Sequence, residues 1–563
     1  MIKKYLFGVV LALSAICSNA ATYYFSDCQT GANAACVAGD DTRTATQAQD
    51  PTTPWRTWAA MPAANKVGNT NIRFARGGRW TGVSIGLGFF TASVSRTNEE
   101  NPMVFEAYTP SWCVNECVNT KPVLYNNTAG AYVFNANDGS NLLDGGYILR
   151  DIKLDGGGMP GLSPIKGSDR GIFLYSTVKG VTIERMEITG FTQGIQMSNN
   201  NGQQTSRVII RNSYLHHNLA ASILGGADDL LIENNIFSNN GSPDAVPDDH
   251  DVYLSHIENG IFRGNTISDT TLDPSTGKCA KTVFVIHGRV KGLLIEDNHI
   301  LQQKARGTCY GIEADSGYTA VTGPEIMERV IIRDNEIVNV GAAGVVVGSC
   351  VDCIIETNRI IWNTPDGYCL VGISTFGGTA PGPEDASNNR NTIRNNSVYM
   401  DCFAGSGAFV KGIEVKNTGS GHVVSNNIVF FGPNTVSNTS RTCFNWDTAG
   451  SLSSFTFTGK NICYYTNGTP TWSNLHSTLS AAQSAGWDVG SLNTDPLFLT
   501  NPGAGNNYSL SLQSTSPAIN SGNQTYKSRL SATRKYPIGN RDIGAFDYSA
   551  SVTAPIAPMV LKN

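Results

Sequence analysis

Seven side chains that can bind or transfer protons fall in three short, successive segments of the chain. They are His250, Asp251 and Tyr253 in the first segment, His287 and Arg289 in the second, and Glu313 and Asp315 in the third. An imidazole titrates near neutral pH and serves as a general base, while a tyrosine hydroxyl supplies a proton. A guanidinium neutralises a carboxylate through two parallel hydrogen bonds. If the fold brings the segments together, the set fits β-elimination from a uronic acid sugar.

β-Elimination gives each side chain an expected role. The base that removes the C5 proton is His250 or His287. Tyr253 protonates the departing oxygen, and Arg289 neutralises the sugar carboxylate. The side chains expected to contact the sugar are Asp251, Glu313 and Asp315. Alternatively, Ca²⁺ neutralises that carboxylate, and its expected ligands are Asp249, Asp251, Glu313 and Asp315. No other cofactor is expected.

Three other interpretations stay open. Hydrolysis of a glycosidic bond needs two carboxyl groups roughly 5–5.5 or 6.5–9.5 Å apart, and Asp251 with Glu313 is the candidate pair. C5-epimerisation shares the first proton abstraction with elimination but cleaves no bond. A non-catalytic adhesion protein would leave the two histidines solvated and Arg289 in a surface ion pair with Glu313, which contributes little stability.

A repeated motif predicts the scaffold that positions these segments. Two or three aliphatic residues precede two variable residues, an asparagine, one variable residue and another aliphatic residue. The asparagines of the copies are Asn212 (with one residue less before it), Asn235, Asn265, Asn298, Asn335, Asn358, Asn396 and Asn427. Short β-branched runs punctuated by Gly and Asn are typical of strands. One coil cannot bury its apolar side, but stacked coils can. The sequence therefore predicts an all-β solenoid, a parallel β-helix with an internal asparagine ladder.

A second strand precedes each asparagine motif, and its alternation assigns its faces. Ile195, Val252, Ile286 and Ile312 are expected to point inward. The expected outward residues are Gln196, Ser198, Asp251, Tyr253, Ser255, His287, Arg289, Glu313 and Asp315. Neighbouring rungs lie about 4.8 Å apart. Longer loops at 239–250, 268–281 and 318–328 leave the same region, and loops on a rigid scaffold commonly build a site.

The chain begins like an exported protein. Lys3 and Lys4 precede an apolar run at 5–16 and small residues at 18–20, a pattern typical of a secretory signal peptide. We therefore expect a signal peptide at 1–20, a secreted or periplasmic location and no membrane-spanning segment. The expected divisions of the mature chain are an N-terminal cap with the first coils at 21–140, the β-helix core at 141–470 and a C-terminal capping segment at 471–563.

Twelve of the 13 cysteines follow the signal segment and fall into pairs that lie close in sequence. The predicted disulfides are Cys28–Cys36, Cys113–Cys117, Cys279–Cys309, Cys350–Cys353, Cys369–Cys402 and Cys443–Cys463. Disulfides form in oxidising compartments, which agrees with export. A zinc site is disfavoured because the CxxC at 350–353 has no second pair at finger spacing.

Composition narrows the partners. The net charge is −5 and only 15% of residues are charged, which argues against nucleic acid as a partner. The 59 glycines favour turns and stacked strands over helices. We expect a polysaccharide substrate, no nucleic acid, no membrane, and a monomer or homotrimer.

The two ends of the chain resemble a family of known proteins. The N-terminal motifs are YYF (23–25), PWRT (54–57) and RGGRW (76–80), and the C-terminal motifs are DPLF (495–498), SPAINSG (516–522) and DIGAF (542–546). They are similar to the opening and closing segments of secreted bacterial right-handed parallel β-helix proteins, many of them polysaccharide lyases. The resemblance covers nearly the whole mature chain. It implies a right-handed β-helix and a carbohydrate-active enzyme, of which a lyase for acidic polysaccharides is the leading hypothesis.

One local motif resembles a different activity on the same fold. Asp248-Asp249-His250-Asp251 is similar to the Asp-Pro-His-Asp segment of β-helical mannuronan C5-epimerases, with Asp249 in place of the proline. That resemblance implies catalytic roles for Asp248 and His250 and a supporting role for Asp251. Epimerase or glycoside hydrolase is thus the alternative to lyase.

Overall fold

The computed structural model describes residues 20–545, apart from several internal segments. The segments left out are 88–97, 138–144, 159–169, 176, 199–204, 242–249, 274–277, 303–308, 316–325, 365–368, 377–387, 403–408, 417–418, 434–439, 448–451, 501–508 and 527–540. The expected signal peptide falls almost wholly outside the described residues. Within them, no helix is both long and apolar enough to cross a membrane.

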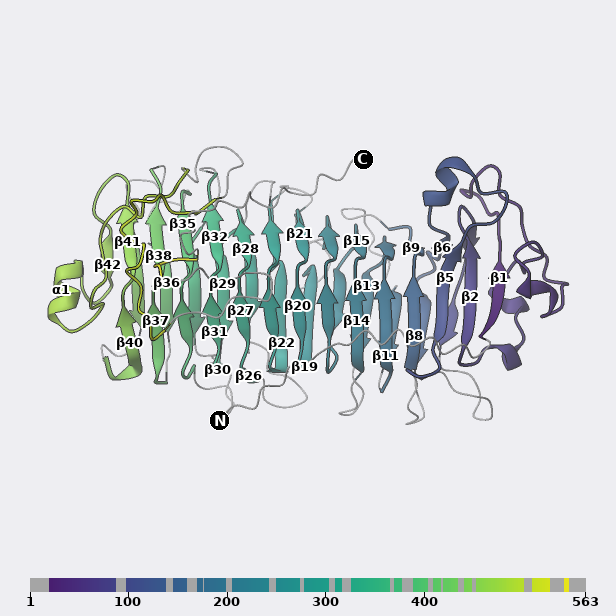
Figure 1. Cartoon of the computed structure of the whole chain (residues 1–563), viewed down its shortest axis with the longest axis horizontal. Coiled ribbons are helices and arrows are strands. Elements are labelled where there is room, and N and C mark those ends of the chain that lie inside the picture. Colours follow the sequence, from purple (N-terminus) through teal and green to yellow (C-terminus); the bar gives the residue numbers. More distant parts are fainter. Residues whose placement is uncertain are drawn as a thin grey trace.

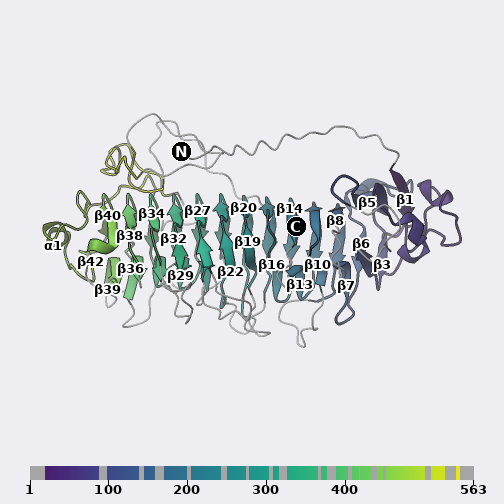
Figure 2. The same cartoon turned by 90° about the horizontal axis from the view of Figure 1, so that it is seen from below.

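Parallel strands wind into three long sheets that run the length of the molecule (Figures 1 and 2). Among the described residues, one sheet has 14 strands, from β1 (Ala21–Phe25) to β40 (Phe455–Gly459), and another has 13, from β3 (Arg79–Thr81) to β41 (Ile462–Tyr465). The third has 15 strands and carries the candidate site. The predicted parallel β-helix is confirmed.

The strands of the 15-stranded sheet are listed here in chain order. They are β4 (Ile85–Leu87), β7 (Tyr132–Asn137), β10 (Arg170–Tyr175), β13 (Gln193–Ser198), β16 (Ala221–Gly225), β19 (Val252–Glu258), β22 (Phe284–Lys291), β25 (Tyr310–Ala314), β26 (Ile326–Glu328), β29 (Ala343–Gly348), β30 (Cys350–Val351), β33 (Val371–Phe376), β36 (Phe409–Lys416), β39 (Ser440–Asp447) and β42 (Thr471–Ser473). The connections that enter or leave this sheet vary in length. The turns between the other two sheets are, by contrast, short and repetitive.

An asparagine ladder fixes the turn between the 14- and 13-stranded sheets. Each side-chain amide donates to the asparagine of the next coil, for example Asn298 Nδ2 to Asn335 Oδ1 at 2.9 Å and Asn335 Nδ2 to Asn358 Oδ1 at 2.9 Å. Seven predicted members form one continuous ladder, and Asn461 extends it by a further coil. Asn212 was predicted wrongly: Ser213 takes the ladder position, where its N–H donates to Asn235. Asn212 instead adopts the positive φ of the preceding turn.

The core is apolar, and the predicted inward residues occupy it. Ile195, Val252, Ile286 and Ile312 are all fully buried. Glycines line one corner of the 15-stranded sheet, where a Cβ on Gly311 would lie 2.5 Å from the carbonyl oxygen of Gly344. A larger residue there would push the coils apart.

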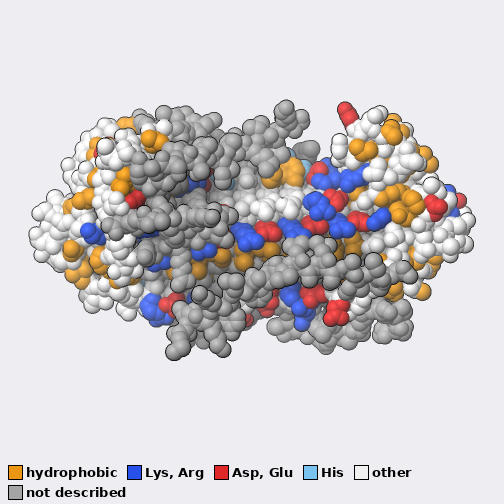
Figure 3. Space-filling view, in the orientation of Figure 1, with side chains coloured by type: hydrophobic (Ala, Val, Ile, Leu, Met, Phe, Trp, Pro, Cys, Tyr) orange, Lys and Arg blue, Asp and Glu red, His pale blue; other side chains and the backbone are white. Residues whose placement is uncertain are grey.

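The outer face of the 14-stranded sheet carries a row of alternating charges (Figure 3). One residue from each successive strand occupies the row, and arginine and glutamate alternate without a break. The members are Arg73, Glu106, Arg150, Glu184, Arg211, Glu233, Arg263, Glu296, Arg333, Glu356 and Arg394. Neighbours pair closely, as Arg333 with Glu296 at 2.6 Å and Arg394 with Glu356 at 2.8 Å. We call this set the Arg–Glu row.

Both ends of the solenoid are closed. Trp55 and Trp80 are buried in the N-terminal cap, and helix α1 (Leu479–Ser484) with Trp487 covers the other end. The segment after this helix does more than cap: Phe498, Leu510 and Ile543 pack on apolar side chains outside the 13-stranded sheet. In Figure 2 this yellow segment lies against the flank of the coils. All six predicted disulfide pairs are present.

Candidate functional site

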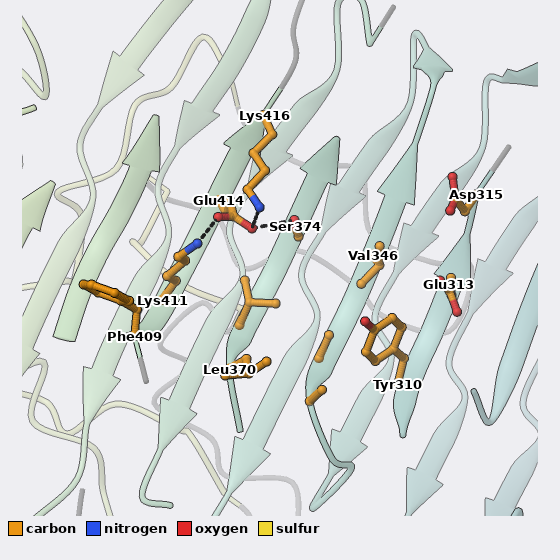
Figure 4. Close-up of a pocket in the computed structure, with 13 residues that line it drawn as sticks. Tyr310, Glu313, Asp315, Val346, Leu370, Ser374, Phe409, Lys411, Glu414 and Lys416 are labelled. Atoms are coloured by element: carbon orange, nitrogen blue, oxygen red, sulfur yellow. Dashed lines mark hydrogen bonds and ion pairs between the residues drawn. The ribbon is translucent and has the colours of Figure 1, made fainter. Parts of the chain in front are cut away.

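A groove of about 600 Å³ lies on the outer face of the 15-stranded sheet, over β25, β29, β33 and β36 (Figure 4). Its floor is largely aliphatic and includes Val346 and Leu370. Glu313 and Asp315 stand at one end, and Lys411 and Lys416 stand at the other. Concave sites with an apolar lining and a few polar groups are the usual places where ligands bind.

Three aromatic side chains form a cluster on the strands next to the groove. The Tyr253 ring centroid is 5.8 Å from that of His250 and 5.4 Å from that of His287. All three side chains are half-buried. The register aligns Tyr253 of β19 with Val285 of β22 and with Glu313 of β25. The structure therefore brings His250, Tyr253 and His287 together beside the carboxylate end of the groove.

Backbone carbonyl groups orient both imidazoles. His287 Nδ1 lies 2.6 Å from the carbonyl oxygen of Asp315, and His250 Nδ1 lies 3.1 Å from that of Thr282. A carbonyl oxygen only accepts, so Nδ1 carries the hydrogen in each ring. In the neutral imidazole, Nε2 then holds the lone pair. This tautomer suits a general base acting through Nε2.

Glu313 is held close to the same cluster. Its carboxyl group accepts a hydrogen bond from the hydroxyl of Thr282, whose backbone carbonyl contacts His250. Burial raises the pKa of Glu313, and the hydrogen bond from Thr282 opposes that rise only in part. A carboxyl group with a raised pKa keeps its proton nearer to neutral pH and can donate it. The sequence did not single out Thr282, which precedes β22 and has no motif of its own.

Asp251 was predicted to face the sugar, and this prediction is wrong. Its side chain is completely buried, and Ser222 Oγ donates to Asp251 Oδ1 at 2.5 Å. Burial raises its pKa to about 7, against the lowering effect of hydrogen bonds from Ser222 and Asn240. Asp251 comes just before β19, so the strand alternation used for the prediction does not extend to it. It is therefore no outward sugar contact or Ca²⁺ ligand, and the Asp251–Glu313 pair is not available for hydrolysis.

Glu313 and Asp315 remain as two carboxyl groups on the same side of one chain segment. They are two residues apart at the end of β25, and both line the groove. The Cα atoms of alternate strand residues are about 6.6 Å apart, so the two carboxyl groups can flank one glycosidic bond, as hydrolysis with two carboxyl groups requires. This pair replaces the one that the sequence suggested.

Arg289 lies farther along β22 than the cluster. It is exposed, two residues beyond His287, where a bulge shifts the register between Ser255 and Ile257. Gly288 supplies the positive φ of +77° at this bulge. The charge of Arg289 lowers the pKa of His256, although burial is the larger cause of that shift. Arg289 is thus near the cluster in sequence but lies in the later part of β22, which pairs with β26.

Two residues of the acidic motif cannot be placed. Asp248 and Asp249 lie outside the described residues, so the comparison with the epimerase segment and the calcium ligand Asp249 stays a prediction. The described part of the chain contains no group of three or more His, Cys, Asp or Glu side chains arranged to hold a metal ion. Glu313 and Asp315 are the members of the predicted calcium set that do face the groove.

The far end of the groove was not predicted from the sequence. Glu414 is nearly buried, and both Lys411 Nζ and Lys416 Nζ contact its carboxylate, the latter at 3.3 Å. Ser374 Oγ donates to Glu414 at 3.1 Å, and Asn445 Nδ2 donates at 2.9 Å. The signal was present, because Gly-Ile-Glu occurs both at 311–313 and at 412–414. Glu313 and Glu414 accordingly occupy the same row of the sheet.

Comparison with known proteins agrees with this architecture. Residues 163–326 match the family described as right handed beta helix region. The match includes β19, β22 and β25, the strands that carry or adjoin His250, Tyr253, His287 and Glu313. No curated protein matches the chain significantly in sequence.

Solved structures give distant likenesses to several β-helix proteins. Pectate lyase Pel9A is 14% identical, with 94% of this chain and 98% of that chain covered and a TM-score of 0.34. The tailspike protein of E. coli bacteriophage HK620, in complex with a pentasaccharide, is 12% identical, with 77% and 70% covered and a TM-score of 0.46. The A-module of Azotobacter vinelandii mannuronan C-5 epimerase AlgE6 is 13% identical, with 76% and 96% covered and a TM-score of 0.34. These likenesses assign no activity to this chain.

Proposed function

We propose that this protein is an exported carbohydrate-active enzyme, a lyase that cleaves an acidic polysaccharide by β-elimination along the groove of the 15-stranded sheet. The observation that carries the proposal is the contact of Tyr253 with two imidazoles whose Nδ1 atoms are bound to carbonyl groups. The six disulfides agree with an oxidising compartment. Proteins of the same fold named in the comparison include a lyase, an epimerase and a glycan-bound tailspike.

The elimination assigns the base to His287. Its Nε2 takes the C5 proton of the uronate, the C4–O bond breaks, and a C4=C5 double bond forms. Tyr253, whose ring lies against His287, gives a proton to the departing oxygen. After cleavage, protonated His287 can return its proton to the Tyr253 oxygen, which restores both groups. His250 also lies against the Tyr253 ring.

Neutralising the sugar carboxylate lowers the barrier to C5 proton removal. Glu313 serves this purpose if it stays protonated, because a neutral carboxyl group donates a hydrogen bond to a carboxylate, and its raised pKa favours that form. Arg289, beyond the bulge of β22, is the second candidate, through a charge-assisted hydrogen bond. Lys411 and Lys416 add positive charge at the other end of the groove, which favours an acidic chain.

An assay on a panel of uronate polysaccharides tests the proposal. We expect the full-length protein to produce an unsaturated product with ultraviolet absorbance from at least one acidic glycan, and His287→Ala to lose it. Reducing ends without that absorbance would mean hydrolysis. Solvent hydrogen incorporated at C5 without cleavage would mean epimerisation.

Hydrolysis is the second candidate, and the placement of Glu313 and Asp315 favours it. Glu313 has the raised pKa expected of a general acid, and Asp315 stands two residues away on the same side. The same panel, extended to neutral glycans, distinguishes the two: hydrolysis predicts that Asp315→Asn abolishes activity, whereas elimination needs no second carboxylate.

A further inference from the structure

The far end of the groove combines an exposed aromatic ring with two lysines. Phe409 is 60% exposed, the largest exposed fraction among the large apolar side chains of the described residues. It stands at the start of β36, and the alternate residue Lys411 projects from the same side. Exposed apolar groups that line a groove commonly mark a binding surface.

Among the described side chains, this end of the groove carries two lysines and one glutamate and is therefore positive. Lys411 and Lys416 share a single carboxylate, Glu414, which is also held by Ser374 and Asn445. Glu414 is nearly buried, whereas about a quarter of Lys411 and a third of Lys416 is exposed. A ligand in the groove therefore meets two ammonium groups more readily than the carboxylate that balances one of them.

The register gives the distance from the cleavage site. Glu313, Val346, Ser374 and Glu414 stand side by side on successive strands. Three strand spacings of about 4.8 Å place Glu414 about 14 Å from Glu313. A polysaccharide chain lying along the groove would pass several sugar units between the two ends.

We propose that Phe409, Lys411 and Lys416 form a distal subsite for an acidic sugar several units from the bond that is cleaved. The ring of Phe409 stacks on the apolar face of the sugar, and the lysines bind its carboxylate. This inference rests on the proposed function, because it takes the substrate to be an acidic polysaccharide along the same groove. The distal subsite on β36 predicts that long oligosaccharides bind more tightly than short ones.

Binding measurements by calorimetry test the subsite, with the full-length His287→Ala protein as an inactive background. The ligands are uronate oligosaccharides of increasing length, prepared from the polysaccharide that the wild type cleaves. If the wild type cleaves none, they are prepared from the acidic glycan that it binds. Phe409→Ala is expected to raise the Kd of the long oligosaccharides about tenfold and to leave the disaccharide unchanged. Phe409→Trp should preserve binding. Lys416→Gln, which leaves Glu414 paired with Lys411, should weaken only the long ligands, and added salt should remove the difference.

Matched controls lie on other faces. Leu499→Ala removes another exposed apolar side chain, and Lys153→Gln breaks a lysine–glutamate pair of 2.6 Å on the 13-stranded sheet. Both should bind all oligosaccharides like the background protein. If Phe409→Ala binds long and short ligands unchanged while the wild type cleaves the polysaccharide, the subsite is wrong and the proposed function stands. If length-dependent binding is lost in Phe409→Ala but the wild type turns over no glycan, the subsite stands and the enzymatic proposal fails.

Discussion

Two outer faces of this β-helix use ionisable residues in opposite ways. On the 14-stranded sheet, arginine and glutamate alternate strand by strand in the Arg–Glu row, so each charge meets its opposite. On the 15-stranded sheet, by contrast, Glu313 meets a threonine hydroxyl, and His250 and His287 meet carbonyl groups and a tyrosine ring. Pairing in the row lowers the pKa of Glu184, whereas burial at the groove raises the pKa of Glu313.

The pKa directions express the same difference. Glu184 in the Arg–Glu row has a lowered pKa, because hydrogen bonds and charges of Arg211 and Arg185 outweigh the effect of burial. Glu313 has a raised pKa, because the effect of burial outweighs that of the hydrogen bond from Thr282. A carboxylate that stays ionised across the working pH range stabilises a fold, while one whose pKa is raised toward that range is suited to proton transfer.

His287→Ala should give the largest effect. Loss of a general base lowers the rate about 10²- to 10⁴-fold, and the melting temperature should change little because the side chain is half-buried on the outer face. Steady-state kinetics on the responsive polysaccharide, with circular dichroism as the fold control, provide the measurement. Full activity would remove His287 from the mechanism.

Arg289→Ala should have the second-largest effect on activity. A charge-assisted hydrogen bond to the substrate is worth roughly 1.5–3 kcal/mol, so kcat/KM on an acidic glycan should fall roughly 10- to 100-fold. Its exposed side chain predicts unchanged stability. Unchanged kinetics would mean that the sugar does not extend past the bulge, and Glu313 would then be left as the neutralising group.

Glu356→Ala should change stability and leave catalysis intact. Glu356 is almost fully buried between arginines of the Arg–Glu row, and its removal leaves Arg394 without this partner. We expect the free energy of unfolding to fall by about 1–3 kcal/mol, with kcat/KM of the folded protein unchanged. Denaturant titration measures the first quantity. A loss of activity without a loss of stability would contradict a purely stabilising role of the Arg–Glu row.

Asp251→Asn should give the most pH-dependent effect, and on stability alone. Burial raises the pKa of Asp251 from 3.8 to about 7, so the folded protein retains a proton that the unfolded chain releases. The wild type therefore loses stability as pH rises through this interval, and the asparagine variant should not. Above pH 7 the variant should be more stable than the wild type by at least about 1.4 kcal/mol, the equivalent of one pKa unit. If the free energies of unfolding of the wild type and the variant change in parallel with pH, Asp251 does not have a raised pKa in the folded protein.

The sequence predicted the scaffold well because its signals are local and repeated. Buried asparagines at one place per coil and β-branched residues around them follow from hydrogen bonding and burial inside a stacked coil. The Arg–Glu row had an equally regular signal that was overlooked. Glu233, Arg263, Glu296, Arg333 and Glu356 each stand two residues before the asparagine of successive motifs, and they alternate in sign.

The site was only partly predictable, because it depends on contacts across coils. Alternation placed Tyr253, His287 and Glu313 correctly on the outer face, since all three lie within strands. It failed for Asp251, which precedes its strand and turns inward to Ser222. The groove itself extends toward Lys411 and Lys416, and that extent depends on which coils are stacked rather than on any single motif.

A crystal structure of His287→Ala with a bound uronate oligosaccharide tests the central claim most directly. We predict that the sugar chain lies across β22, β25, β29, β33 and β36, with one glycosidic bond beside Tyr253 and Glu313. An oligosaccharide bound on the 13- or 14-stranded sheet, with the groove of the 15-stranded sheet empty, would contradict it.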